Sequence, residues 1–151
     1  MTTVYDAPPN ALIESVAEQL KGMKGLEPPE WTSYVKTGIH REKSPVNEDW
    51  WYVRLAAIMR KVYIKGPIGS SRLAGEFGGP RDRGSKPNRA VKGSGSVTRK
   101  ALQQLDRAGL INTVRYKGRV ISPEGQKLLD NTAHKILTEM AKTDPELSKY
   151  C

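Results

Sequence analysis

The sequence predicts a single, mainly α-helical domain of 151 residues that carries one small β-hairpin. Three observations support this fold class. Apolar residues recur at helical spacing in several segments, glycine and proline end these segments, and alternating apolar and polar residues follow Gly109. A chain of this length is expected to form one core. Because no repeat or interdomain linker is recognisable, residues 1–151 are predicted to fold as one domain.

The N-terminal part predicts one regular helix and one short helix. Asn10 is a suitable N-cap for a helix over residues 11–21, which Gly22 ends. The apolar stripe of this helix is Leu12, Ile13, Val16, Ala17 and Leu20. A second, short helix is expected between residues 28 and 38, with Trp31, Tyr34 and Val35 facing inward.

The central part predicts the main core helix. It is expected to start after Asn47, which is followed by two acids that suit a first helical turn, and to end at Gly66-Pro67. Its inward stripe is Trp51, Leu55, Ile58, Met59 and Val62. Ser70 then caps a predicted short helix that reaches Phe77 and buries Leu73, Ala74 and Phe77.

Residues 78–95 form a glycine-rich basic segment between two predicted helices. The segment has five cations, one carboxylate and almost no apolar residue to bury. A long loop of this kind is either functional or disordered, and its charge predicts contact with a polyanion. We expect a loop that is flexible in the free protein, with Asp82 forming ion pairs to neighbouring arginines. The cations are Arg81, Arg83, Lys86, Arg89 and Lys92.

The last third of the chain predicts a helix, a hairpin and a final helix. The first helix spans residues 96–108, faces inward through Thr98, Ala101, Leu102, Leu105 and Ala108, and stops at Gly109. The hairpin covers residues 110–121 and turns at Lys117-Gly118. Ser122-Pro123-Glu124 starts the final helix, and the tail after Thr143 is expected to fray.

This order of elements is typical of a winged helix-turn-helix, with residues 96–108 as the recognition helix and residues 110–121 as the wing. One departure concerns the connection. A helix-turn-helix that reads DNA joins its two helices by a turn of about 3–4 residues, whereas a long basic segment intervenes here. Such a segment suits the irregular surface of folded RNA better than the regular groove of duplex DNA. The fold alone does not distinguish these partners.

Positive charge is concentrated in the middle of the chain. The formal net charge is +9, and residues 54–119 contain sixteen Lys and Arg against three acids. This asymmetry predicts a nucleic-acid partner, with an anionic membrane surface as the weaker alternative. No apolar stretch approaches the roughly 18 residues of a spanning helix, and no signal peptide is recognisable. A soluble, cytoplasmic protein is therefore expected.

No motif for catalysis or metal binding is recognisable. His40 and His134 lie far apart without companion residues, and no Cys/His cluster has zinc spacing. Gly78-Gly79 lacks the Gly-Lys-Ser/Thr of a phosphate loop. We therefore expect no enzyme, no catalytic or metal-ligating residue, and no cofactor. The single cysteine, Cys151, leaves no internal disulfide framework and fits a reducing compartment.

Several short motifs follow one another in an order and spacing that resemble one protein family. They are Pro29–Trp31, Tyr34–Gly38, Asp49–Ala57, Arg60–Tyr63, Gly66–Gly69, Gly78–Gly79, Gly93–Arg99 and Gly109–Ile111. Together they resemble the archaeal and eukaryotic small-subunit ribosomal protein nineteen-e family over nearly the whole chain. The short C-terminal tail is more similar to archaeal members. The resemblance implies a winged-helix core, binding to ribosomal RNA in the head of the small subunit, and a role in pre-ribosomal RNA processing and subunit maturation.

The resemblance further implies RNA-facing residues at the end of the central helix and the start of the recognition helix, which here are Arg60 and Arg99 with Lys100. We expect binding by neutralisation of phosphates rather than by reading of base edges. The predicted RNA-binding residues are Arg54, Arg60, Lys61, Arg81, Arg83, Lys86, Arg89, Lys92, Arg99, Lys100, Gln103, Arg107, Arg115, Lys117 and Arg119. Neighbouring small-subunit proteins are the other expected partners, and the chain is expected to be a monomer within the ribosome.

Two other functions remain open at this point. A winged-helix transcription regulator would bind duplex DNA as a dimer through Arg99, Gln103 and Arg107. A scaffold protein would bind other proteins through the acidic N-terminal and C-terminal helices.

Overall fold

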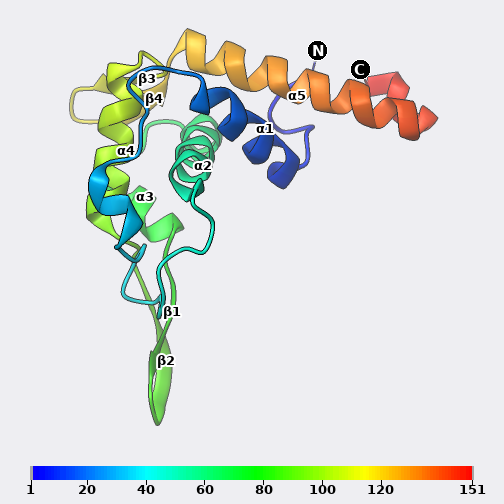
Figure 1. Cartoon of the computed structure of the whole chain (residues 1–151). Helices are drawn as coiled ribbons and strands as arrows, with labels where there is room; N and C mark the ends of the chain where they lie inside the picture. The colour runs from blue at the N-terminus through cyan, green and yellow to red at the C-terminus, as the bar shows by residue number, and fades with distance from the viewer. Residues whose placement is uncertain (1, 151) are drawn as a thin grey trace.

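The computed structural model describes residues 2–150, so the expectation about Cys151 lies outside the described residues. The prediction of a mainly α fold is confirmed (Figure 1). The helices are α1 (Pro9–Lys21), α2 (Trp50–Lys65), α3 (Ser70–Glu76), α4 (Gly95–Arg107) and α5 (Pro123–Thr143), with short 3-10 helices η1 (Glu30–Ser33) and η2 (Pro145–Tyr150). The strands are β1 (Gly79–Arg83), β2 (Lys86–Val91), β3 (Ile111–Val114) and β4 (Gly118–Ile121).

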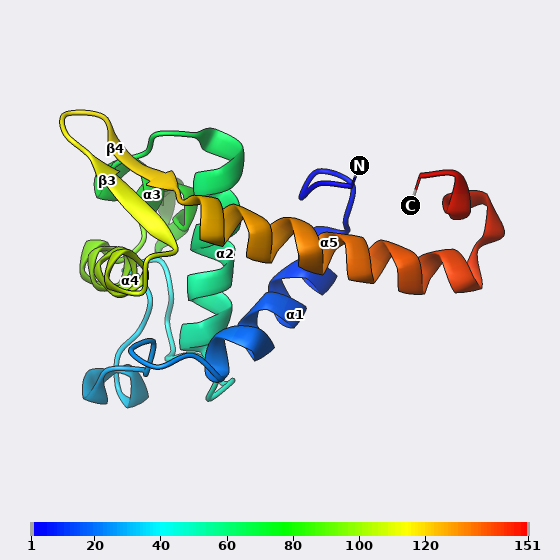
Figure 2. The ribbon, with the colours of Figure 1, turned by 90° about the horizontal axis from the view of Figure 1, so that it is seen from above.

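Helix α2 lies at the centre of the core, as its apolar stripe predicts. The five predicted core residues of α2 are all fully buried: Trp51, Leu55, Ile58, Met59 and Val62. Figure 2 shows α2 between α1 on one side and α3 and α4 on the other, with α5 running past α1. The apolar stripes of α1, α4 and α5 close around α2, so one continuous core serves the helices on both sides.

The basic segment forms a hairpin, so the prediction of a loop over residues 78–95 is wrong. Strands β1 and β2 pair antiparallel from Gly79 opposite Val91 to Arg83 opposite Lys86. Gly84 has a φ of 70° in the turn, and the Asp82 carboxylate accepts the Gly84 N–H at 2.9 Å. These turn features favour pairing in a segment that has almost no core contact. Figure 1 shows the hairpin projecting from the helical body.

The second hairpin connects α4 to α5, as expected. Gly109 ends α4 with a φ of 76°, and the Leu110 N–H donates to the Leu105 carbonyl at 3.0 Å. Strands β3 and β4 pair from Ile111 opposite Ile121 to Val114 opposite Gly118. The turn between them spans residues 115–117, so Gly118 lies at the start of β4 and not in the turn as predicted.

Three predicted helix caps are wrong, and one is confirmed. Helix α1 begins at Pro9, so Asn10 lies inside its first turn and is not its N-cap. Helix α2 begins at Trp50, so its N-cap is Asp49 and not the predicted Asn47, whose side chain accepts the Asp49 N–H. Gly69 rather than Ser70 precedes α3. Ser122 caps α5, and its hydroxyl accepts the Gly125 N–H at 3.0 Å. Apolar periodicity locates a helix but leaves its ends uncertain by one or two residues.

The segment between α1 and α2 is less helical than predicted. Its 3-10 helix η1 is short because the Thr32 and Ser33 hydroxyls bond the carbonyls of Pro29 and Glu30, which competes with a longer helix. Trp31 packs against the core as expected. Tyr34 is 73% exposed, so its inward assignment is wrong. The tail after Thr143, expected to fray, forms η2 instead.

Substitution of Gly125 tests how closely α5 packs against Leu110, the residue before β3. A Cβ atom at Gly125 would lie 2.3 Å from the Leu110 carbonyl oxygen, whereas one at Gly75 in α3 meets nothing within 4 Å. We expect Gly125→Ala to lower the free energy of unfolding by about 1–3 kcal/mol, because α5 must shift. Gly75→Ala is the control and should be neutral or stabilising by up to about 1 kcal/mol. Urea denaturation measures both, and equal effects would contradict the close packing.

Candidate nucleic-acid interface

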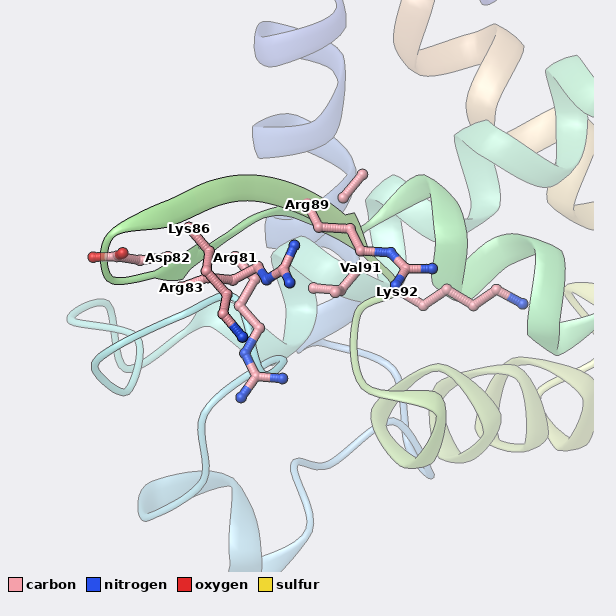
Figure 3. A pocket seen from close by; sticks show the side chains of 8 residues that line it. Arg81, Asp82, Arg83, Lys86, Arg89, Val91 and Lys92 are labelled. Carbon is pink, nitrogen blue, oxygen red and sulfur yellow. The ribbon is translucent and has the colours of Figure 1, made fainter.

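The β1–β2 hairpin presents a strongly cationic, exposed surface. The structure brings together all five cations predicted in this segment, and they line a shallow hollow of about 600 Å³. Figure 3 shows Arg81, Arg83 and Lys86 gathered on one side of the hairpin, with Asp82 pointing away from them. Because Asp82 bonds the Gly84 backbone, the predicted ion pairs between Asp82 and arginines are absent from the described residues.

The strand register places like charges opposite each other. Arg81 pairs directly with Arg89, and Arg83 pairs with Lys86. Like charges at directly opposite positions destabilise an antiparallel pair, and an isolated two-stranded hairpin is only marginally stable in water. A polyanion that neutralises these pairs would therefore both bind the hairpin and stabilise it.

The predicted cations of α2 differ in their surroundings. Arg60 is half-buried, and its Nε atom has no hydrogen-bond partner within residues 2–150. Lys61 lies 2.9 Å from the Glu76 carboxylate, which Lys65 also contacts at 3.0 Å. The two ammonium groups, Lys61 foremost, lower the pKa of the Glu76 carboxyl below its ordinary value. Lys61 is thus already paired with a carboxylate, whereas Arg60 is not.

Helix α4 carries its predicted cations on the face away from the core. Arg99, Lys100 and Arg107 are exposed, and Gln103 is half-buried. The Ser94 hydroxyl caps this helix by accepting the Val97 N–H. Helix α4 crosses α2 instead of running along it (Figures 1 and 2). The expected common patch of Arg99 and Arg60 stays a prediction.

The β3–β4 hairpin contributes two fully accessible cations. Arg115 and Lys117 are exposed in the turn, on either side of Tyr116, which is 93% exposed. Arg119 is half-buried because its backbone pairs with Ile68, with N···O distances of 2.9 and 3.1 Å. The Arg115 guanidinium carbon lies 5.0 Å from the centre of the Tyr116 ring.

Arg54 has neighbours that the sequence analysis missed. Its guanidinium carbon is 4.3 Å from the centre of the Phe77 ring. Burial, together with the positive charge of Arg41, lowers the pKa of Arg54 below its ordinary value. Lys36 and Arg41 line hollows beside the hairpin and α2. The basic residues of the segment that begins at Lys36 are the sequence signal that could have added Lys36 and Arg41 to the predicted RNA-binding residues.

Two negative findings concern the described residues. Within residues 2–150, no group of three or more His, Cys, Asp or Glu side chains is arranged to hold a metal ion. No helix in that range is long and apolar enough to cross a membrane.

Comparison with known proteins identifies similar chains. Residues 3–139 match the model of the family described as Ribosomal protein S19e. The protein named small ribosomal subunit protein eS19 in Thermoplasma acidophilum is 47% identical over 150 residues, which cover 99% of each chain. Its counterpart in Aeropyrum pernix is 46% identical with the same coverage. Small ribosomal subunit protein eS19A of Schizosaccharomyces pombe is 39% identical over 91% of this chain and 95% of its own.

The like-charge pairs in the hairpin predict that repulsion weakens the pairing of its two strands in the free protein. Arg89→Glu places an acid opposite Arg81, which should stabilise the β1–β2 pairing by about 0.2–1 kcal/mol. Amide hydrogen exchange of the hairpin should slow in this variant. Arg72→Glu makes the same charge change at an exposed residue of α3 and should leave that exchange unaltered. Unchanged or faster exchange in Arg89→Glu would contradict the repulsion between the strands.

Proposed function

Because the chain belongs to the ribosomal protein S19e family, we propose that it is a structural constituent of the small ribosomal subunit and binds ribosomal RNA through its basic surface. The supporting observation is the projecting β1–β2 hairpin, whose Arg81 and Arg89 lie opposite each other and form no ion pair with an acid of residues 2–150. A protein with no polyanionic partner gains nothing from that arrangement, whereas closely spaced phosphates neutralise it.

The proposed mechanism is neutralisation of backbone phosphates by three groups of cations. The β1–β2 hairpin is the adaptable group, since its strands have little contact with the core and become ordered when RNA supplies the missing negative charge. Arg60, Arg99 and Lys100, on two packed helices, form the rigid group. Arg115 and Lys117 in the β3–β4 turn reach a further stretch of backbone. Contacts of this kind fix the orientation of the protein on RNA and do not read its sequence.

We also propose that α3, α4 and the β3–β4 hairpin form a winged helix in which the turn between the two helices is replaced by the β1–β2 hairpin. This replacement weighs against the alternative of a transcription regulator, because a projecting hairpin stands beside the helix that would enter a DNA groove. The similar chains carry ribosomal names and give that alternative no support.

Further properties follow from this proposal. The protein is located in the cytoplasm, within the ribosome, as a single copy that contacts ribosomal RNA and neighbouring small-subunit proteins. It has a structural and not an enzymatic role. By ordering RNA during assembly, it supports processing of pre-ribosomal RNA and maturation of the small subunit.

Sedimentation of native cell extract tests the proposed location. On a sucrose gradient, the protein should migrate with the small subunit, and treatment with RNase should release it. The reason is that phosphate contacts, not protein contacts alone, hold it in the particle. A position at the top of the gradient with and without RNase would contradict a ribosomal location and return attention to DNA binding.

Substitution of Arg99 tests whether the rigid group of cations is needed for incorporation into the small subunit. Arg99→Glu should strongly reduce incorporation into small subunits while leaving the melting temperature unchanged, because this side chain is exposed. Lys127→Glu makes the same charge change at an exposed position of α5, outside the proposed surface, and should assemble normally. The measurements are the fraction of each variant in the small-subunit peak and its thermal unfolding by circular dichroism. Normal assembly combined with early melting of Arg99→Glu would mean that Arg99 is structural.

A further inference from the structure

A hollow of about 900 Å³ lies between α2 and residues 37–46, and it shares no lining residue with the hollow of the hairpin face. Its floor is one face of α2, where the lining residues recur at i, i+3, i+4 and i+7: Trp50, Val53, Arg54 and Ala57. Phe77 closes one side. The hollow is therefore wide, apolar at its floor, and open to solvent between two chain segments.

The positive charge around this hollow is only partly balanced by an acid. Arg54 is half-buried against the Phe77 ring, and neither Arg54 nor Arg41 forms an ion pair within residues 2–150. With Lys43 and one acid, Glu42, the lining has an excess of two positive charges. A partly desolvated guanidinium beside a second cation is unfavourable unless an anion binds between them. The arrangement suits a phosphate group.

The wall opposite α2 is held in place by the base of the hairpin. The Ser94 N–H donates to the Thr37 carbonyl at 2.8 Å. The His40 ring fits against two glycines: a Cβ atom at Gly38 would lie 2.7 Å from the ring, and one at Gly79 would lie 3.0 Å from it. The hollow is therefore preformed, and its shape does not depend on the outer part of the hairpin.

A second, smaller hollow connects this site to the hairpin. It measures about 500 Å³, and its charged lining residues are Lys36, Arg41 and Arg81 together with the acids Glu42 and Asp82. It shares Arg41 with the hollow on α2 and Arg81 with the hollow of the hairpin face. Because cations exceed acids by one here, an RNA strand that follows the hairpin passes over a surface of net positive charge before it reaches the hollow on α2.

We propose that this hollow binds one unpaired nucleotide of RNA, with its phosphate between Arg41 and Arg54 and its base against the apolar face of α2. The inference rests on the proposed function and adds a defined site to it. The volume falls within the range of about 300–1,000 Å³ that is usual for small-ligand sites. RNA-binding proteins commonly take bases that are splayed out of helices and pack them on aromatic side chains. Trp50 supplies such a side chain here, whereas the Phe77 ring packs against the Arg54 guanidinium.

Titration of the intact protein with three probes tests this site. The probes are a single-stranded RNA hexanucleotide, 5′-AMP and inorganic phosphate, and the signals are the NMR resonances of the Trp50 indole N–H and the Arg54 Nε–H. Both should shift saturably, with the hexanucleotide binding most tightly and phosphate most weakly, because phosphate makes no contact with the α2 face. Tighter binding of 5′-AMP than of the hexanucleotide would overturn the assignment to RNA.

Three variants separate the site from general charge attraction. Arg41→Ala removes an exposed contact to the phosphate and should weaken 5′-AMP binding about tenfold, as loss of a charged hydrogen bond does. Arg72→Ala removes the same charge from α3, outside the hollow, and should change the affinity less than about twofold, since exposed charges act weakly at a distance. Ala57→Leu fills the floor and should weaken 5′-AMP binding while leaving phosphate binding unchanged.

The outcomes distinguish this site from the broader proposal. Equal effects of Arg41→Ala and Arg72→Ala, or unshifted Trp50 and Arg54 resonances, would overturn the nucleotide site. If the protein still sediments with the small subunit by way of RNA, the proposed function stands without this site. If sedimentation with the small subunit fails while 5′-AMP still binds in the hollow, the ribosomal proposal fails instead.

Discussion

Burial of α2 along its length is the constraint on which the other elements depend. The Trp51 ring is fully buried and meets the rings of Trp31 and Trp50 edge-on, with centroids 5.5 and 5.6 Å away. Its indole N–H donates to the Gln104 side chain at 2.9 Å, and Gln104 in turn donates to the Glu27 carbonyl. One aromatic side chain thereby links α2 to α4 and to the segment that precedes η1, and it fixes the helices that carry the proposed RNA contacts.

The base of the β1–β2 hairpin is rigid, whereas its outer part is not supported by the core. Gly93 donates its N–H to the Ala74 carbonyl at 2.9 Å, and a Cβ atom there would lie 2.7 Å from the Phe77 carbonyl oxygen. Beyond this base, residues 81–90 are exposed, and within residues 2–150 neither strand pairs with any strand except the other. A fixed base and a weakly stabilised end would let the hairpin adapt to the irregular surface of the proposed RNA partner while the protein keeps its orientation.

Positive and negative side chains are concentrated in different parts of the molecule. The hairpin cations lie at one end, whereas the groove between α1 and α5 is lined by Glu14, Glu18 and Glu139. Figure 1 shows the hairpin extending away from α5. In the field of a polyanion, such a molecule turns its hairpin toward the phosphates and its α1–α5 side away from them.

The sequence by itself determined the helical core and the position of positive charge. The stripe from Trp51 to Val62, the stop at Gly109 and the start at Ser122 were predictable, because burial and capping depend on residues close together in the chain. Tertiary structure alone decided that residues 79–91 pair as strands, since their register depends on a turn and on a base clamped by Ala74 and Thr37. It also decided that Arg41 lies near Arg54, because a hollow between segments that are not adjacent in sequence leaves no local pattern.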